Sequence, residues 1–234
     1  MTIAERWGAV QARVIAACER AGRPASEVTI VAVSKTHPAT AILEAFAAGA
    51  TDFGENYAQE LAAKQAELAA SGLAATPTHT ALRWHYIGRL QRNKARLVAG
   101  RVALVHAVDT VGLAEELGRR AAGVVQPILL AVNLAGEDTK GGVTAGAAPD
   151  IARALAAVPG VSLEGLMTMP PPADDPEASR PYFVALRALR DRLADALGRS
   201  LPALSMGMSH DFEIAIACGA THVRIGTAIF GVRG

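Results

Sequence analysis

Short β-branched or apolar runs alternate with stretches of helical spacing along the whole chain. Eight of these runs predict buried parallel strands: Thr29–Ser34, Thr51–Glu55, Arg83–Gly88, Val102–Val108, Gln126–Asn133, Val161–Met167, Ala203–Met208 and His222–Phe230. Helical stretches precede the first run and separate the runs from one another. This order predicts an α/β fold, with residues 1–234 as one domain folded into a single-domain (β/α)8 TIM-like barrel with an extra N-terminal helix. A doubly wound open sheet fits less well, because it uses fewer strands and no G-x-G-x-x-G motif follows the first run.

Apolar residues at helical spacing mark two long helices. They fall on one face at Ile3, Trp7, Val10, Val14 and Cys18, and again at Tyr182, Leu186, Leu189, Leu193 and Leu197. Pro38 suits the first turn of a helix that stops near Gly49. The proline-rich segment Pro170–Pro181 follows a strand end, and it is predicted to be a long mobile loop over the barrel mouth.

The composition narrows the class of protein. With 51% hydrophobic and 19% charged residues, the 234 residues can bury a sizeable core and do not resemble a disordered chain. A net charge of +1 gives no global attraction to nucleic acid or to an anionic membrane. Cys18 and Cys218 are expected to be free thiols in a reducing compartment. Because the sequence also has neither a signal peptide nor a bilayer-spanning run, we expect a cytoplasmic protein with no nucleic-acid or membrane partner.

The functional site of a parallel barrel lies at the carboxyl ends of its strands. Only four of the 23 basic residues are lysines, and Lys35 is the one that stands at such an end. A partly desolvated amine can attack an aldehyde and form a Schiff base, which a guanidinium cannot do. The ends of the last two runs carry Ser209 at a helix start and the pair Gly226 and Thr227, where such barrels often bind phosphate.

A lysine and a phosphate cradle across one barrel mouth suggest pyridoxal 5′-phosphate (PLP). Lys35 would meet the aldehyde of PLP, and Ser209 with the Gly226-Thr227 amides would meet its phosphate. Arg224 lies two residues before Gly226 and would face the pyridine ring or the phosphate.

Three separated motifs carry a family resemblance over nearly the whole chain. They are V31-A-V-S-K-T36, then R83-W-H-Y-I-G-R-L-Q-R-N-K94, then L204-S-M-G-M-S-H-D-F-E213 followed by V223-R-I-G-T-A-I-F-G231. In these motifs the chain resembles the pyridoxal phosphate homeostasis protein family, single-domain relatives of the alanine racemase N-terminal barrel.

The resemblance implies a role for each residue of the site. It implies that Lys35 carries the cofactor, that Ser209, Gly226 and Thr227 hold the phosphate, and that Arg224 meets the pyridine nitrogen. Asn56 matches a family position that lines the cofactor. The family's role is cofactor binding and vitamin B6 and amino-acid homeostasis, with no firmly established catalytic reaction.

Structural readings of the same residues remain open. Lys35 could be a surface lysine, Ser209 a helix N-cap, Asn56 a helix cap, and Arg224 the partner of Glu55 or Asp211 in an ion pair. The six histidines show no metal-ligand spacing, so no metal site is expected. The basic residues Arg89, Arg92, Lys94, Arg96 and Arg101 are interpreted as the solvated face of a third helix.

The sequence favours a PLP carrier over an enzyme. An arginine beside the ring nitrogen keeps its proton, so the ring stays neutral and is a weak electron sink. The resemblance implies that a second domain supplies a racemase's opposing base, and this chain ends at Gly234 with no room for one. Two alternatives stay open: a weak PLP-dependent amino-acid racemase or decarboxylase-like enzyme, and a Schiff-base aldolase without cofactor. Expected partners are PLP, amino acids and PLP-dependent apo-enzymes as recipients, with the protein a monomer or weak dimer.

Overall fold

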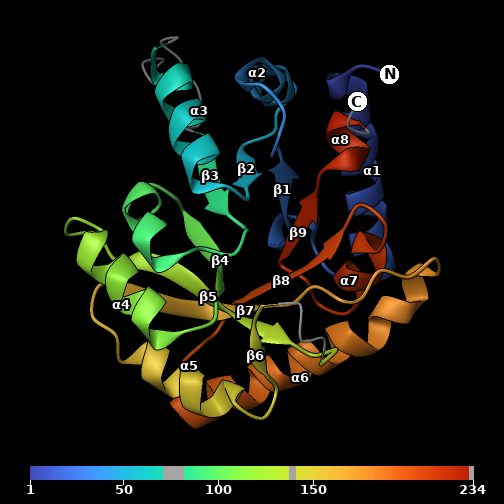
Figure 1. Cartoon of the computed structure of the whole chain (residues 1–234). Coiled ribbons are helices and arrows are strands. Elements are labelled where there is room, and N and C mark those ends of the chain that lie inside the picture. Colours follow the sequence, from blue (N-terminus) through green and yellow to red (C-terminus); the bar gives the residue numbers. More distant parts are fainter. Residues whose placement is uncertain (71–81, 137–140, 232–234) are drawn as a thin grey trace.

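Eight parallel strands close into a barrel in the computed structural model, which describes residues 1–70, 82–136 and 141–231 (Figure 1). The barrel strands are β1 (Thr29–Val33), β2 (Asp52–Glu55), β3 (Arg83–Tyr86), β4 (Leu104–Val108), β5 (Gln126–Asn133), β7 (Val161–Met167), β8 (Ala203–Met208) and β9 (His222–Ile225). They pair in this order, each neighbouring pair is parallel, and β9 pairs with β1 to close the ring. The predicted barrel is confirmed.

Helices surround the strands and connect them. The α-helices are α1 (Ile3–Arg20), α2 (Ala39–Ala47), α3 (Ala58–Ala70), α4 (Val111–Arg120), α5 (Ala148–Ala156), α6 (Arg180–Leu197), α7 (Phe212–Ala217) and α8 (Thr227–Phe230). The described part of the chain also contains the short 3-10 helices η1 (Ala25–Glu27), η3 (Arg92–Leu97) and η4 (Pro176–Ser179). The basic residues after β3 therefore lie on and around the short 3-10 helix η3, where the sequence predicted an α-helix.

Two local predictions differ from the structure, and one short strand was not predicted. The run His222–Phe230 is a strand only as far as Ile225, and its second half is helix α8, because an apolar run does not reveal whether it is a strand or a buried helix. A two-residue strand, β6 (Val143–Thr144), pairs with β5 outside the barrel ring. The segment Pro170–Pro181 contains η4 and the start of α6, where Pro181 occupies the first turn, so it is not one continuous loop; its mobility stays a prediction.

The predicted N-terminal helix α1 packs against the C-terminal helices of the barrel. A capping box between Thr2 and Glu5 starts this helix. Its predicted apolar face is buried against the barrel, whereas in α6 Phe183 takes the buried place expected for Tyr182. Arg6 donates from Nε to the carbonyl oxygen of Ile229 in α8 at 2.6 Å, and α1 also packs against α7 (Figure 1). Since α7 and α8 follow the last two strands, α1 fixes the elements that carry the predicted phosphate site.

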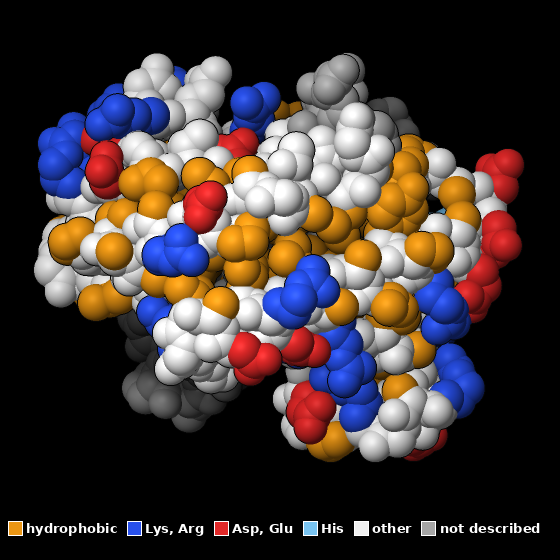
Figure 2. All heavy atoms as spheres, turned by 90° about the horizontal axis from the view of Figure 1, so that it is seen from below, with side chains coloured by type: hydrophobic (Ala, Val, Ile, Leu, Met, Phe, Trp, Pro, Cys, Tyr) orange, Lys and Arg blue, Asp and Glu red, His pale blue; other side chains and the backbone are white. Residues whose placement is uncertain are grey.

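Neither sign of charge dominates the face of the molecule seen in Figure 2. Figure 2 shows Lys and Arg scattered among Asp, Glu and hydrophobic side chains on the side where α5 and α6 lie in Figure 1. No helix among the described residues is long and apolar enough to cross a membrane.

Candidate functional site

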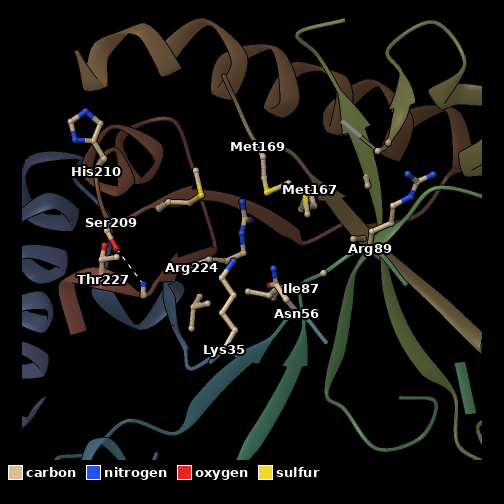
Figure 3. Close-up of a pocket in the computed structure, with 18 of the residues that line it drawn as sticks. Lys35, Asn56, Ile87, Arg89, Met167, Met169, Ser209, His210, Arg224 and Thr227 are labelled. Carbon is tan, nitrogen blue, oxygen red and sulfur yellow. Dashed lines mark hydrogen bonds between the residues drawn. The ribbon is translucent and has the colours of Figure 1, made fainter. Parts of the chain in front are cut away.

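A cavity of about 470 Å³ opens at the carboxyl ends of the barrel strands. All six residues predicted for the site line it: Lys35, Asn56, Ser209, Arg224, Gly226 and Thr227. Figure 3 shows Lys35 extending into this space, with Ser209 and Thr227 on one side and Asn56 and Ile87 on the other. The structure therefore brings together residues that lie up to 192 positions apart in the sequence, from Lys35 to Thr227.

Lys35 is the second residue after β1 and is half-buried. A tight turn follows the strand here, because the amide of His37 donates to the carbonyl oxygen of Ser34 at 3.0 Å. Within this turn Thr36 has φ +67°, in the left-handed region that β-branched residues rarely adopt. The conformation of the chain at Lys35 is therefore set by its surroundings and not by local preference.

Ser209 and the start of α8 form the opposite side of the cavity. The Ser209 hydroxyl accepts a hydrogen bond from the amide of Gly226 at 3.3 Å (Figure 3) and another from the amide of Ala228 at 3.4 Å. Ser209 thus interacts with the first residues of α8, not with α7, whose N-cap is Asp211. These amides and the hydroxyl are donors of the kind that bind phosphate oxygens.

Gly207 allows β8 to reach Ser209 in this position. Its φ is +90°, and a Cβ atom there would lie 2.5 Å from the Cβ of Ala215. A side chain at this position would push β8 away from α7, so the site requires glycine here.

Arg224 places a buried cation in the wall of the cavity, with 4% of its surface exposed. Its guanidinium donates to the Ser205 hydroxyl at 2.5 Å and to the carbonyl oxygen of Thr168 at 3.0 Å. Burial lowers the pKa of Arg224 to about 10, partly offset by Asp211, so the residue stays charged at neutral pH. Two of its five N–H groups are occupied by these bonds, which leaves donors for a ligand.

The two ion pairs that the sequence left open for Arg224 do not form in the structure. Glu55 binds Lys64 at 2.6 Å. Asp211 accepts hydrogen bonds from the Ser179 hydroxyl at 2.8 Å and from the amide of Met208 at 2.7 Å.

A chain of hydrogen bonds runs from Arg224 through the inside of the barrel. Ser205 Oγ lies 2.7 Å from His106 Nδ1, and His106 Nε2 lies 3.0 Å from His85 Nδ1. His85 Nε2 lies 2.8 Å from Asp52 Oδ1. Burial alone would raise the pKa of Asp52, but hydrogen bonds from His85, Arg83 and Thr51 outweigh it and hold that pKa well below its usual range.

The directions of these hydrogen bonds follow from the groups at the two ends. Ionised Asp52 only accepts, so His85 Nε2 carries a hydrogen. Ser205 accepts from Arg224 and has its own hydrogen to give to His106 Nδ1, so His106 Nε2 donates to His85 Nδ1. Every donor therefore points from the Arg224 cation toward the Asp52 carboxylate. The chain ends beside a second cavity, of about 610 Å³, which the first residues of several strands line.

Asn56 follows β2 and lines the cavity with no helix-cap role. Its side-chain amide makes no hydrogen bond with the residues that the structure describes. Its carbonyl oxygen accepts from Tyr86 Oη at 2.9 Å. A Cβ atom at Gly88 would lie 2.2 Å from this same oxygen, so the two strand ends meet at van der Waals distance only because residue 88 is glycine.

Sequence reasoning missed the residues under and around the predicted site. The inner partners of Arg224 are Ser205 and Thr168, and the apolar wall of the cavity includes Met167, Met169 and Met208. The alternation of strand residues could have identified Ser205 as facing the same interior as Arg224, since both lie on adjoining strands. Within the described ranges no group of three or more His, Cys, Asp or Glu could hold a metal ion.

The arrangement combines an amine, a buried cation and a set of anion donors in one cavity. Its volume lies within the range usual for small-molecule sites. The amine can react with a carbonyl carbon, and the Ser209 hydroxyl with the amides after β9 can bind a phosphate at the other end of the same ligand. The donor set therefore fits a phosphorylated aldehyde, with a polar ring atom near Arg224.

Comparisons with known proteins agree with this geometry. The chain matches the family "Alanine racemase, N-terminal domain" over residues 8–234. A pyridoxal phosphate homeostasis protein of Aquifex aeolicus (strain VF5) is 44% identical over 235 residues, covering 100% of this chain and 99% of that protein. A protein of the same name from Pseudomonas aeruginosa is 44% identical over 234 residues, covering 99% of this chain and 96% of that protein.

A solved structure is similar over the same length. PipY of Synechococcus elongatus PCC7942, with PLP bound, has a TM-score of 0.83 and 36% identity and covers 98% of this chain and 100% of its own. The relatives' identities and their coverage confirm the resemblance that the three motifs carry. The chain belongs to the pyridoxal phosphate homeostasis protein family and has the barrel of the alanine racemase N-terminal domain.

Proposed function

We propose that this protein binds PLP as a Schiff base on Lys35 and acts in intracellular PLP and amino-acid homeostasis. The observation that carries the proposal is that Lys35, the Ser209 hydroxyl and the Gly226 amide lie in one cavity of about 470 Å³. The names of the relatives and the PLP bound to PipY support the same ligand.

Lys35 would hold the cofactor covalently. Its neutral Nζ attacks the aldehyde carbon of PLP, a C=N bond replaces the C=O bond, and the carbonyl oxygen leaves as water. Bound in this way, PLP supplies a conjugated ring that can accept electrons. No oxidant or reductant is needed, and the bond is reversed by water or by another amine, as a carrier requires.

The other residues would bind and orient the cofactor without reacting. The Ser209 hydroxyl and the Gly226 and Thr227 amides would bind the phosphate, in place of the long bonds that Ser209 now accepts. Arg224 would donate to the pyridine nitrogen with N–H groups that its two inner partners leave over. Asn56 would line the cofactor with an amide that has no other hydrogen bond among the described residues.

Arg224 is the reason we propose a carrier and not an efficient enzyme. Its pKa of about 10 keeps it protonated at neutral pH, so it donates to the ring nitrogen and does not protonate it. An unprotonated pyridine stabilises negative charge at an amino-acid α-carbon poorly.

The spectrum of the purified protein tests the proposal. Incubation with PLP should give a yellow protein whose visible absorbance survives gel filtration, and inorganic phosphate should compete with it. A protein that stays colourless under saturating PLP would leave the Schiff-base aldolase as the better interpretation.

Deuterium exchange at the α-carbon of alanine separates a carrier from an enzyme. Exchange by PLP-saturated protein at about 1 s⁻¹ or faster, as in ordinary enzymes, would favour the weak racemase or decarboxylase-like alternative.

We propose that residues 1–234 act as one domain, as a monomer or weak dimer, in the cytoplasm. Amino acids and PLP-dependent apo-enzymes are the proposed recipients of the cofactor, because both present amines that can exchange with Lys35.

A further inference from the structure

Lys64 is a buried lysine for which the proposed PLP site has no use. It lies on α3, and only 6% of its surface is exposed. Its ammonium group donates to three oxygens: the carbonyl of Ser34 at 2.7 Å, Glu55 Oε1 at 2.6 Å and Glu60 Oε1 at 2.7 Å. An ammonium has three N–H donors, so each of them has one acceptor. In a chain that uses arginine for most of its positive charge, this position requires the compact geometry of lysine.

The two glutamates extend these contacts to the residues beside Lys35. Glu55 Oε1 also accepts from the Ser34 hydroxyl at 2.7 Å. Glu60 Oε1 also accepts from the amide of Thr36 at 2.5 Å. We call Lys64, Glu55 and Glu60 the Lys64 cluster. The cluster binds Ser34, the residue before Lys35, through its carbonyl oxygen and its hydroxyl. It binds Thr36, the residue after Lys35, through its amide.

The backbone at Lys35 needs such support. Thr36 is one of only two described residues other than glycine with a positive φ. Such conformations persist only where surrounding contacts determine them. The Ser34 carbonyl and the Thr36 amide both bind the Lys64 cluster, so the cluster contacts the strained turn on both sides of the residue that is expected to react.

The composition of the Lys64 cluster is not the one expected of residues whose main role is to stabilise the fold. Glu55 is fully buried, and its Oε2 has no hydrogen-bond partner among the residues that the structure describes. Burial raises the pKa of Glu55, and hydrogen bonds from Lys64 and Ser34 only partly oppose this. A buried ion pair of this kind is often matched or exceeded in stability by hydrophobic residues of similar volume. A role in positioning explains why charged residues occupy this place.

We propose that the Lys64 cluster is a positioning device, which holds the main chain at Ser34 and Thr36 so that the Lys35 amine meets the aldehyde of its ligand. The inference rests on the proposed function and deepens it, because it assigns the residues that prepare Lys35 for the reaction. None of the three touches the cavity, so they act through Lys35 and are not themselves reactive. The physical reason is that covalent capture requires a near-attack geometry, and a displacement of about 1 Å can slow it by about 100-fold.

The first test replaces Lys64 by methionine, with Lys94→Met as the matched control. Lys94 is half-buried on η3 and forms no ion pair with the described residues. The wild type and Lys94→Met should take up PLP equally. Lys64→Met should form the visible chromophore between about 10 and 100 times more slowly. Its induced circular dichroism in the visible band should also change, because this signal reports the orientation of the bound ring relative to the chain.

A second pair of variants keeps the test decisive if Lys64→Met does not fold. Glu60→Gln retains an oxygen that can accept from Thr36, whereas Glu60→Ala removes it. Glu60→Gln should keep the wild-type rate and dichroism, and Glu60→Ala should lose both while its far-ultraviolet spectrum stays native. Equal rates and spectra in Glu60→Ala, Glu60→Gln and wild type would overturn the positioning role. A wild-type protein that takes up no PLP would instead overturn the proposed function itself, so the two failures are distinguishable.

Discussion

Arg224 donates a hydrogen bond from Nη1 to the hydroxyl of Ser205, at 2.5 Å, inside the barrel and below the cavity that Arg224 lines. The guanidinium is therefore held from within, and its remaining donors are available to the cavity. Ser205 in turn lies 2.7 Å from His106, which begins the chain of hydrogen bonds toward Asp52. Hydrogen bonds thus link the cation beside the proposed ring position to the Asp52 carboxylate at the far end of the barrel, without a direct ion pair.

Removal of the Ser205 hydroxyl should destabilise the fold and loosen Arg224. Ser205→Ala leaves a buried N–H of Arg224 and Nδ1 of His106 without partners, which costs about 1–3 kcal/mol for each unsatisfied group. Urea unfolding at pH 7 should show this loss, and the exposed-site variant Ser26→Ala should match wild type. A stability of Ser205→Ala equal to that of wild type would show that the hydrogen-bond chain contributes nothing to the barrel.

The buried His222 should make the fold sensitive to mild acid. Burial lowers the pKa of His222 from its ordinary value of 6.5 to about 4, with a further contribution from His85. Between these two pKa values, His222 binds a proton in the unfolded chain but not in the folded protein. The free energy of unfolding therefore falls as the pH decreases from about 6.5 and levels off near 4. One such group accounts for about 3 kcal/mol across that window.

Urea unfolding between pH 7 and pH 4.5 measures this effect. His222→Gln removes one titrating group and should reduce the slope, and the buried His106, whose pKa burial also lowers, accounts for the slope that remains. The exposed-site variant His210→Gln should retain the full slope. Parallel curves for wild type and His222→Gln would show that His222 titrates alike in the folded and unfolded chains.

Ser209 should contribute to PLP affinity mainly through the phosphate. Loss of one hydrogen bond to a charged group costs about 1.5–3 kcal/mol, so Ser209→Ala should bind PLP about 10- to 100-fold more weakly. The same variant should bind pyridoxal, which lacks the phosphate, as wild type does. Spectral titration with each aldehyde measures both constants, with the exposed-site variant Ser200→Ala as control. An equal loss for pyridoxal and PLP would place the role of Ser209 elsewhere.

Both cysteine thiols should react slowly in the folded protein. Cys18 and Cys218 are free and buried, and burial raises the pKa of each thiol. A low thiolate fraction and poor access both slow attack on a disulfide reagent. Aromatic disulfide titration should detect almost no reaction within minutes in buffer and two thiols in urea. Rapid labelling of the native protein would mean that α1 or α7 opens readily.

The residues at the strand ends could be predicted from the sequence because their signals are local. Lys35 and Ser209 each follow an apolar run directly, and a parallel barrel brings such positions to one face. The strand boundary at Ile225 could not be predicted in this way. Residues 228–230 are apolar and at least partly buried, and the sequence pattern is the same for a strand end as for one helical turn.

The support beneath the site could not be predicted, because it depends on contacts between distant residues. His106 and Ser205 are 99 positions apart, and their contact follows from the register of the closed barrel. The Lys64 cluster depends on how α3 lies against the end of β1. Neither the charge pattern nor the periodicity of the sequence contains that information, and a buried lysine contradicts the usual expectation for its residue type.

Reduction with borohydride followed by peptide mapping tests the central claim most directly. The protein is saturated with PLP and reduced, which converts the C=N bond to a stable amine, and the labelled peptide is sequenced. The account predicts one phosphopyridoxyl group per chain, on Lys35, and none on a folded Lys35→Ala variant. Label on Lys64 or Lys94, or equal label in Lys35→Ala, would contradict it.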